Sequence, residues 1–376
     1  MNKLTLLFRT SVVNQYIKIP VISNISIISK KSLCSNPNFK PFESNVQLDD
    51  STEKVVNVAI IGLPNAGKST LINNLIDRKV CATSSKVHTT RKVAKGICTE
   101  GSTQIVFLDT PGLVTKEEKN RYNLEDSFIS SFKSCMIAAD VVCVIHDASN
   151  HWTRDKLHFK VRKLLERFPE VPSLLVLNKI DLLKSKRVLL DLVRNLTEGK
   201  LSNRHHKDED QEDFKLDYSE DKPLEVSLDK EQKKGWPRFT NVFMVSCLEQ
   251  TGLEDLKEYL VALSRPRPWP YSPLQSSDLS NEQIIEHAVR AKLLDFMPQE
   301  IPYNLKTQIE LYEENNEGVI TASVIVTCPS DRVKKLLEGC SSGKLRQITN
   351  HVTADLQQAF YQPINLIITT TVSPVK

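Results

Sequence analysis

One short segment constrains the fold of this chain more than any other. Residues 62–69 read Gly-Leu-Pro-Asn-Ala-Gly-Lys-Ser, which fits the pattern G-x-x-x-x-G-K-[ST]. The apolar, β-branched run at 55–61 predicts a buried strand before it, and residues 70–75 predict a helix after it. A glycine-rich loop between a strand and a helix N-terminus wraps phosphate groups with its backbone N–H groups. We therefore expect an α/β domain with a phosphate site, in which Lys68 contacts the β- and γ-phosphates and Ser69 contacts Mg²⁺.

A second motif follows a second predicted strand. Residues 103–108 are mostly apolar and lead into Asp-Thr-Pro-Gly at 109–112, a D-x-x-G segment. An acid at a strand end can hold Mg²⁺ through water, and a glycine lets its own N–H approach the γ-phosphate closely. We predict these two roles for Asp109 and Gly112.

A third motif indicates which base is bound. Residues 173–177 predict a strand that leads into Asn-Lys-Ile-Asp at 178–181. A carboxylate at Asp181 can accept hydrogen bonds from both N1–H and the 2-amino group of guanine, whereas adenine offers neither and would leave the acid unpaired. We expect Asn178 to brace the loops and the stem of Lys179 to lie along the base.

Two further segments complete the expected site. A strand at 242–247 ends in Ser246-Cys247, a turn where a backbone N–H can meet the guanine O6. The polar loop at 84–91 predicts a switch whose hydroxyl completes the Mg²⁺ shell, with Thr90 as the first candidate and the neighbouring threonine as its substitute. Motifs at successive strand ends predict a doubly wound, mostly parallel sheet with ligands at the carboxyl ends of its strands.

Length and composition exclude several classes of protein. A length of 376 residues allows about two domains with tails or linkers. With 40% hydrophobic and 26% charged residues, the chain is unlike collagen, a coiled coil or a wholly disordered protein. A net charge of +4 is too small to indicate a polyanionic partner, and no run of eighteen apolar residues predicts a transmembrane helix. The eight cysteines form no C-x-x-C pair, which favours buried thiols in a reducing compartment over disulfides or zinc.

Two segments predict no packed structure. Residues 1–42 contain six Lys or Arg and no Asp or Glu, a composition typical of a mitochondrial transit peptide, which we place at 1–44. A disordered tail of chance composition is the alternative. Residues 199–235 are mixed in charge without apolar periodicity, which predicts a disordered insertion within the nucleotide domain at 55–264.

The prolines at 265–273 predict a stiff, extended linker at 265–280, before a second domain at 281–373. Ser280 can cap the first helix of that domain together with Gln283. The later elements are expected as strands at 306–313 and 319–328, helices at 331–337 and 344–360, and a strand at 365–372. The order is α-β-β-α-α-β.

These motifs resemble the Era family of translation-linked GTPases, and most of all its mitochondrial branch in animals. The likeness rests on segments that read G-L-P-N-A-G-K-S, H-T-T-R, D-T-P-G-L and N-K-I-D, at 62–69, 88–91, 109–113 and 178–181. It extends over about residues 55–372, apart from the insertion. It implies a Ras-like P-loop GTPase domain, α/β in class with a doubly wound and mostly parallel sheet, followed by an α+β type II KH domain.

The resemblance also bears on catalysis. Such proteins carry a hydrophobic residue where Ras-type proteins have their water-orienting glutamine, and here that residue is Leu113. Leucine cannot hydrogen-bond a nucleophilic water, so slow intrinsic GTP hydrolysis is expected. Asn65 matches an asparagine that related GTPases use to coordinate K⁺, which makes K⁺ stimulation a hypothesis. The catalytic residues expected are Lys68, Thr90 and Gly112, and those expected around Mg²⁺ are Ser69, Thr90 and Asp109. The full set expected to contact GTP or GDP is Gly62, Pro64, Asn65, Ala66, Gly67, Lys68, Ser69, Thr70, Asp109, Gly112, Asn178, Lys179, Asp181, Ser246 and Cys247.

KH modules clamp about four nucleotides with a G-x-x-G loop between two helices. An ungapped reading of this loop gives Gly-Cys-Ser-Ser at 339–342, with the next glycine one place late. Serine adds a Cβ where a phosphate should approach, which weakens or shifts the backbone contact. We favour RNA binding over a KH relic that binds protein. The RNA-binding residues expected are Lys334, Lys335, Gly339, Ser341, Ser342, Gly343, Lys344 and Arg346.

The resemblance implies a GTP-hydrolysing RNA chaperone that binds small-subunit ribosomal RNA and assists assembly of the mitochondrial small ribosomal subunit. It would work in the matrix, with a peripheral place on the inner membrane left open. The alternative is a GTP-dependent protein-binding or membrane-associated scaffold with negligible hydrolysis and RNA binding.

Overall fold

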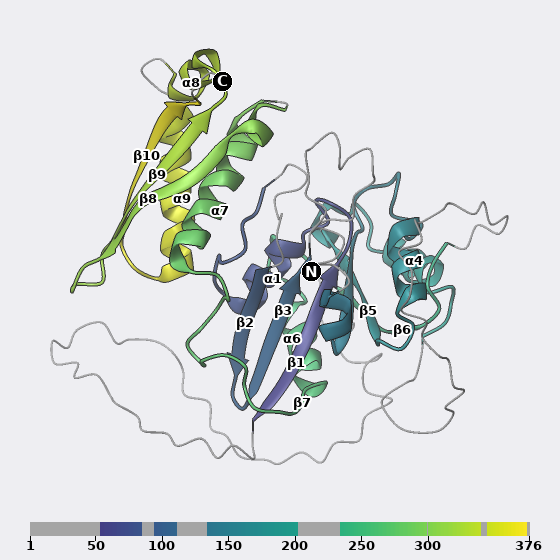
Figure 1. The fold of residues 1–376 in the computed structure, drawn as a ribbon. Helices are drawn as coiled ribbons and strands as arrows, with labels where there is room; N and C mark the ends of the chain where they lie inside the picture. Colours follow the sequence, from purple (N-terminus) through teal and green to yellow (C-terminus); the bar gives the residue numbers. More distant parts are fainter. Residues whose placement is uncertain are drawn as a thin grey trace, which may run out of the picture. The chain divides into compact units, whose positions relative to one another are not determined.

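The computed structural model describes residues 53–84, 94–110, 134–201, 234–298, 300–339 and 344–373. The first part of the chain forms a seven-stranded sheet in the order β2-β3-β1-β4-β5-β6, with β7 paired to β1 (Figure 1). Strand β2 is antiparallel to β3, and β1, β3, β4, β5 and β6 run parallel. This is the doubly wound, mostly parallel sheet that the motifs predict. Its elements are β1 (Lys54–Ile61), α1 (Lys68–Ile76), β2 (Ala94–Glu100), β3 (Thr103–Asp109), β4 (Val141–Asp147), α4 (Phe159–Arg167), β5 (Ser173–Asn178), the 3₁₀ turn Ile180–Leu182, α5 (Val188–Leu196), β6 (Phe239–Met244), α6 (Leu253–Ala262) and β7 (Arg265–Pro266).

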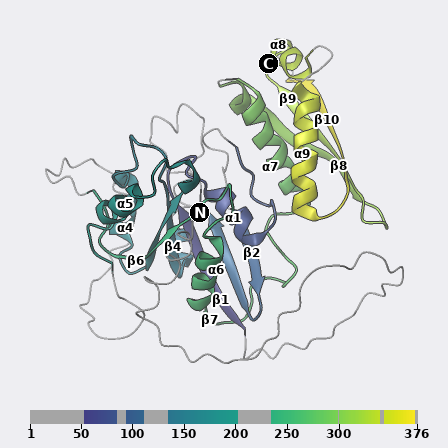
Figure 2. The same ribbon diagram turned by 180° about the vertical axis from the view of Figure 1, so that it is seen from behind.

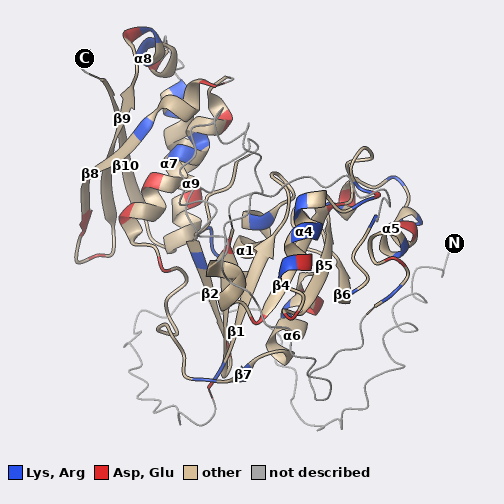
Figure 3. Ribbon diagram, turned by 45° about the vertical axis from the view of Figure 1, so that its right-hand side comes forward, with Lys and Arg blue, Asp and Glu red and all other residues tan. Residues whose placement is uncertain are grey.

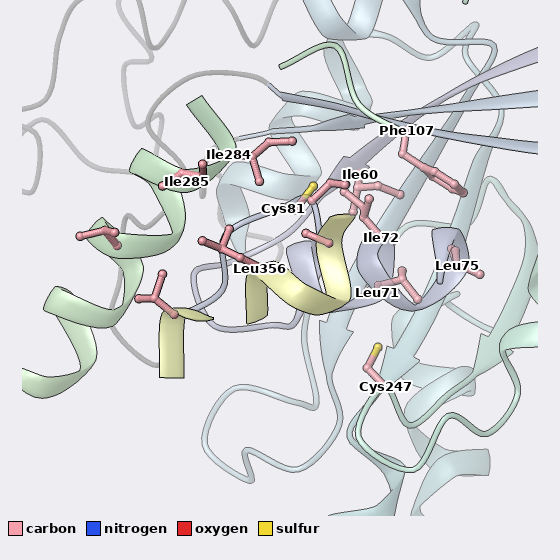
Figure 4. Packing of buried hydrophobic residues seen from close by; sticks show 14 of the residues in the cluster. Ile60, Leu71, Ile72, Leu75, Cys81, Phe107, Cys247, Ile284, Ile285 and Leu356 are labelled. Carbon is pink, nitrogen blue, oxygen red and sulfur yellow. The ribbon is translucent and has the colours of Figure 1, made fainter. Parts of the chain in front are cut away.

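Apolar residues cover both faces of this sheet. Successive side chains of a strand point to opposite faces, and Val58 and Ile60 of β1 belong to one buried cluster while Ala59 and Ile61 belong to the other. The first cluster includes residues of α1 and α6, and the second includes residues of α4 and α5. Figure 4 shows the first cluster from close by, with Ile60 among its labelled side chains, and Figure 2 shows α6 in front of the sheet. Helices on both faces account for the nearly unbroken apolar run of β1.

The proline-rich segment after α6 starts as a two-residue strand and is bonded to the nucleotide domain. It does not stay extended, since it turns where the N–H of Gln275 donates to the carbonyl oxygen of Ser272. Arg265–Pro266 pairs antiparallel with the start of β1, and the backbone N–H of Trp269 donates to the carboxylate of Glu53. Tyr271 and Gln104 exchange two hydrogen bonds, of 3.0 and 3.2 Å. This stretch is therefore held along strands β1 and β3 and is not a free spacer.

The carboxyl domain has the predicted order of elements: α7 (Asn281–Phe296), β8 (Lys306–Glu314), β9 (Ile320–Cys328), α8 (Asp331–Glu338), α9 (Lys344–Phe360) and β10 (Ile364–Val372), with a 3₁₀ turn at Ile301–Asn304. Its sheet has the order β10-β9-β8, with β10 parallel and β8 antiparallel to β9. Helices α7 and α9 pack on each other and on the sheet. Ser280 and Gln283 form the expected reciprocal cap of α7.

Three local differences separate the structure from the sequence expectations. Strand β6 spans Phe239–Met244 and not 242–247, because the chain turns at Ser246, which pairs with Thr251. Gly235, assigned to the insertion, is buried beside the backbone of Leu196. Strand β2 was not expected from the sequence.

The expectation of buried cysteine thiols is confirmed within the described residues. Six of the eight cysteines lie there, and all six are buried free thiols. No helix in the described part of the chain combines the length and apolar character needed to cross a bilayer.

Candidate guanine-nucleotide site

The expected nucleotide residues lie at the carboxyl ends of neighbouring parallel strands. Ile60 of β1 pairs with Asp109 of β3, and Asp147 of β4 pairs with Asn178 of β5. The loops that leave these strands therefore emerge at one edge of the sheet, where open α/β folds bind ligands.

The phosphate loop needs its two glycines for packing as well as for phosphate approach. A Cβ on Gly62 would lie 2.5 Å from the carbonyl oxygen of Ile145. A Cβ on Gly67 would lie 2.3 Å from Nδ2 of Asn178, and the φ of Gly67 is +104°. A side chain at Gly62 would collide with β4, and one at Gly67 would collide with the last residue of β5. Pro64 and Ala66 lie in the loop between these glycines, and Thr70 follows in α1.

The ammonium group of Lys68 is held inside this loop. Its Nζ donates to the carbonyl oxygens of Gly62 at 3.3 Å and Leu63 at 3.0 Å. Burial lowers the pKa of Lys68 to about 8, while the charge of Asp109 acts in the opposite direction. A buried cation next to loop N–H groups is placed to meet an anion such as a phosphate chain.

Ser69 and Asp109 lie side by side, although 40 residues separate them in the chain. The Ser69 hydroxyl donates to Oδ2 of Asp109 at 2.9 Å. The next residue, Thr110, is anchored because its hydroxyl donates to the carbonyl oxygen of Ile60 at 2.5 Å. Hydroxyl and carboxylate oxygens are ligands that Mg²⁺ prefers, so these residues suit the expected magnesium role.

Asn178 connects three loops. Its Nδ2 donates to the carbonyl oxygen of Ala66 at 2.9 Å, and its Oδ1 accepts from the N–H of Cys247 at 3.1 Å. The carbonyl oxygen of Cys247 in turn accepts a bond from the side chain of Asn74 in α1. The brace expected at Asn178 is therefore present as a hydrogen-bonded link between the phosphate loop and the turn after β6.

The carboxylate expected to read the base is fixed by a serine. The hydroxyl of Ser246 donates to Oδ1 of Asp181 at 2.6 Å and accepts from the N–H of Glu249 at 3.1 Å. Next to it, burial raises the pKa of the Cys247 thiol to about 12, so this side chain is neutral near pH 7. The arrangement presents one oriented carboxylate and a neutral turn, which suits a base that donates two hydrogen bonds.

Asp147 is a site residue that the motifs do not identify. Its Oδ2 lies 2.6 Å from Nζ of Lys179, and its Oδ1 accepts from both the N–H and the hydroxyl of Ser149. Partial burial raises the pKa of Asp147, but the bonds from Lys179 and Ser149 outweigh it and leave the pKa below its ordinary value. The signal that could have found it is an acid at the end of β4, the strand next to β5.

Several expected residues lie outside the described part of the chain: Thr90, Gly112, Leu113, Ser341, Ser342 and Gly343. The other residues expected to bind RNA flank the loop at 340–343. Lys334 and Lys335 lie in α8, Gly339 follows it, and Lys344 and Arg346 begin α9. Lys334 is within 3.8 Å of Glu338 and so shares its charge with an acid.

Comparison with known proteins identifies similar sequences. Residues 57–179 match the sequence model of the family described as "50S ribosome-binding GTPase". The chain is 38% identical to "GTPase Era, mitochondrial" of Danio rerio over 370 residues, which is 91% of this chain and 82% of that protein. It is 36% identical to the protein of the same name in Salmo salar, over 83% of this chain and 75% of that protein.

Two solved structures share the fold over both parts of the chain. One is Era in complex with MgGDPNP and nucleotides 1506–1542 of 16S ribosomal RNA, with a TM-score of 0.65, 23% identity, and coverage of 86% of this chain and 94% of that chain. The other is a single-residue variant of Aquifex aeolicus Era bound to GDP and AlF₄⁻, also with a TM-score of 0.65 and 23% identity, covering 85% of this chain and 94% of that one.

Proposed function

Because this chain belongs to the Era family of GTPases, we propose that it is a guanine-nucleotide switch that binds small-subunit ribosomal RNA and assists assembly of the mitochondrial small ribosomal subunit. As a member of that family, it hydrolyses GTP to GDP and phosphate. Family membership argues against the alternative of a scaffold without hydrolysis.

One observation carries the nucleotide part of this proposal. The carboxylate of Asp181 is oriented by Ser246, and Asn178 ties the same region to the phosphate loop that holds Lys68. A ligand that satisfies both ends must have a phosphate chain at one end and two adjacent N–H donors at the other. Guanosine di- and triphosphates meet both requirements, whereas adenine nucleotides lack the donors.

The residues at the phosphate end also fit Mg²⁺. The hydroxyl of Ser69 and the carboxylate of Asp109 are 2.9 Å apart and can both turn their oxygens to a cation. Bound Mg²⁺ would neutralise charge on the β- and γ-phosphate oxygens. Lys68 would supply a second positive charge from inside the loop, and the N–H groups at the start of α1, which follow Gly67, would donate to the same phosphates.

We propose that placement of the attacking water limits the rate of GTP hydrolysis. Leu113 offers no hydrogen bond to this water, so turnover should depend on a cation or on a bound partner. Asn65, in the phosphate loop with a φ of +60°, is the residue we propose for K⁺. GTP turnover by the same protein in K⁺ and in Na⁺ buffers of equal ionic strength tests this, and equal rates would remove K⁺ from the proposal.

The RNA part rests on the carboxyl domain. Helices α8 and α9 flank the loop at 340–343, as the helices of a KH module flank its nucleotide clamp. The relative solved with a 16S ribosomal RNA fragment is similar over most of this chain, which supports small-subunit RNA as the ligand. Crosslinking the tagged protein in cells and sequencing the bound RNA tests this, and RNA at background level would exclude it.

The place of action is proposed from the relatives and from the amino end. Relatives in two fishes and in Caenorhabditis elegans are named as mitochondrial, and residues 1–44 have the composition of a transit peptide. We place the protein in the matrix, with peripheral attachment to the inner membrane as a second location. Sonication of purified mitochondria at low salt, followed by centrifugation, separates the two locations: a matrix protein stays in the supernatant, whereas a peripheral protein sediments with the membranes and is released from them by carbonate.

Calorimetry tests the nucleotide site directly. Folded protein with Mg²⁺ should bind GDP and GTP and should not bind ATP. The variant Lys68→Ala should lose affinity for both nucleotides while keeping a cooperative thermal transition. Binding of ATP as tight as that of GTP would contradict the role given to Asp181.

A further inference from the structure

One segment of the nucleotide domain carries a local excess of positive charge that the KH-like domain lacks. Residues 151–200 contain twelve Lys or Arg and six Asp or Glu. Residues 281–376 contain nine Lys or Arg and eleven Asp or Glu. Since electrostatic attraction to phosphates supplies much of the affinity for nucleic acid, the KH-like domain is poorly supplied with the charge that RNA binding needs.

Five of these twelve cations lie in helices α4 and α5, and a sixth is the N-cap residue of α5. In α4, Lys160, Lys163 and Arg167 are spaced i, i+3 and i+7, which places them along one side of the helix. In α5, Arg187 at the N-cap and Arg194 are seven residues apart and share a side in the same way, and the exposed Asp191 lies between them on that side. We call these five residues the α4–α5 cationic face.

The two helices lie on the same side of the sheet. Val161 and Leu165 of α4 and Leu189 and Leu192 of α5 are buried in one cluster with residues of β4 and β5. The opposite sides of the helices are therefore turned to solvent, and Figure 3 shows blue residues on both helices. Consecutive parallel strands joined by right-handed crossovers place their helices side by side, which makes the two rows of cations neighbours.

Part of this charge has no acidic partner in the described chain. Arg162 of α4 is 3.5 Å from Glu166, so its charge is shared. By contrast, Arg167, Arg187 and Arg194 are exposed and make no ion pair with any residue in the described ranges. Exposed guanidinium groups suit phosphate recognition, since each can donate two parallel hydrogen bonds.

Exposed aromatic side chains lie at and just before the amino end of α4, the end that carries Lys160. Trp152, in the turn before α4, is 81% exposed, and Phe159 at the start of α4 is 43% exposed. The ring of Trp152 lies 4.4 Å from that of His151, so the turn presents two neighbouring rings. Exposed rings among cations form the combination on which unpaired bases stack while the backbone is held electrostatically.

We propose that the α4–α5 cationic face, with Trp152, is a second RNA-binding surface that holds single-stranded segments of the RNA bound by the carboxyl domain. The inference rests on the RNA-binding function proposed above and adds the surface that supplies most of its electrostatic affinity. It also explains how a KH-like domain with an irregular loop and little net charge can take part in RNA binding.

The salt dependence of RNA binding measures this surface. Each phosphate contact on a single strand contributes about 0.7 to the slope of log K against log salt concentration. The variant Arg167→Gln/Arg194→Gln removes two positive charges from the face. If each arginine meets one phosphate, the magnitude of the slope should fall by about 1.4. The variant Trp152→Ala should weaken binding at least about 5-fold, the effect of losing one stacked base.

A matched control is available on the same domain. Lys54 and Arg238 are exposed and lie at the amino ends of β1 and β6, the edge of the sheet opposite the nucleotide. The variant Lys54→Gln/Arg238→Gln removes the same net charge and should leave the slope unchanged. Binding of GDP by each variant confirms that the nucleotide domain is folded.

The full-length mature protein is titrated into a labelled single-stranded RNA from the 3′ end of its own small-subunit ribosomal RNA, at several salt concentrations. A smaller slope in the face variant alone supports the proposal. Equal slopes in all three proteins overturn it while leaving the RNA function standing, whereas an unaltered protein that binds no RNA overturns both. Loss of binding to vesicles containing anionic lipid, with an unchanged RNA slope, would also overturn it and assign the face to a membrane.

Discussion

The ion pair between Asp147 and Lys179 makes a quantitative prediction about guanine binding. Asp147→Asn keeps an oxygen that can accept both bonds from Ser149, so the turn after β4 should persist, but it removes the charge that fixes Lys179. The two side chains are 22% and 31% exposed, which places the pair between a surface ion pair and a buried one. We expect a loss of about 1–2 kcal/mol in folding free energy.

The effect on nucleotide binding should be smaller, and it has a different origin. The pair already exists without nucleotide, so its energy does not enter the binding constant directly. What enters is the cost of immobilising a freed Lys179 against the base, about 0.5–1.5 kcal/mol for a long side chain. The Kd for GDP should therefore rise about 2-fold to 13-fold. Since the pKa of Asp147 is lowered, the pair is charged at pH 7, where the titration should be done.

Asp140 provides the control at the other end of the same strand. Its carboxylate accepts from the N–H of Asn57 at 2.8 Å and pairs with Arg267. Asp140→Asn should destabilise the protein by a similar amount without changing the Kd for GDP. The reasoning is refuted if the two variants shift the Kd equally, or if Asp147→Asn binds GDP as tightly as the unaltered protein.

Four further predictions concern the phosphate loop and the core. The pKa of Lys68 is lowered in the nucleotide-free protein, and the phosphates of GDP should raise it again. Binding of GDP at about pH 9 should therefore be accompanied by uptake of part of a proton, and this uptake should vanish near pH 6. The dependence of the calorimetric binding enthalpy on the buffer measures it. Below about pH 8 Lys68 is protonated in both the folded and the unfolded protein, so the free-energy cost of burying its charge is at its full value. The stability of the nucleotide-free protein should increase as the pH rises from about 8 to 10.5, because the folded protein loses this proton first. Gly67→Ala should lower the free energy of unfolding by about 2–4 kcal/mol and abolish GDP binding, because its Cβ meets Asn178. Gly101→Ala is the control, since Gly101 also has a positive φ, of +56°, but its Cβ would meet nothing within 4 Å. It should lower the free energy of unfolding by about 1 kcal/mol in the same urea titration. Phe107→Ala, which empties a fully buried position in β3, should cost about 3–5 kcal/mol in the same assay.

Much of the nucleotide domain could be predicted because its motifs stand at strand ends. The strand before the phosphate loop is a β-branched run buried on both faces, and such runs are readily read from sequence. Strand β2 was missed for a physical reason. It contains Gly96, a poor strand residue, but a Cβ there would lie 2.4 Å from Cδ1 of Ile76, so the glycine is what lets α1 pack over this strand. The need for a glycine at position 96 is set by helix α1, so the residues next to Gly96 in the sequence do not indicate a strand.

The candidate site shows the same division between local and long-range information. Lys68, Asp109 and Asp181 could be identified from the sequence, because the chemistry of phosphates and of guanine requires these residue types in these motifs. The partners that orient these groups come from other strands: Ser69 reaches Asp109 across 40 residues, and Ser246 reaches Asp181 across 65. Which hydroxyl meets which carboxylate depends on strand order and register, and these are properties of the folded sheet.

The links between the loops explain why separate motifs can act as one site. Asn178 holds the carbonyl of Ala66 with one end of its amide and the N–H of Cys247 with the other. A shift of the base-reading loop must therefore lengthen one of these bonds or move the phosphate loop with it. The loops that we propose for the base and for the phosphates are thus linked through a residue that is 2% exposed. Because both bonds go to backbone atoms, this link depends on the side chain of Asn178 and not on the side chains of Ala66 and Cys247.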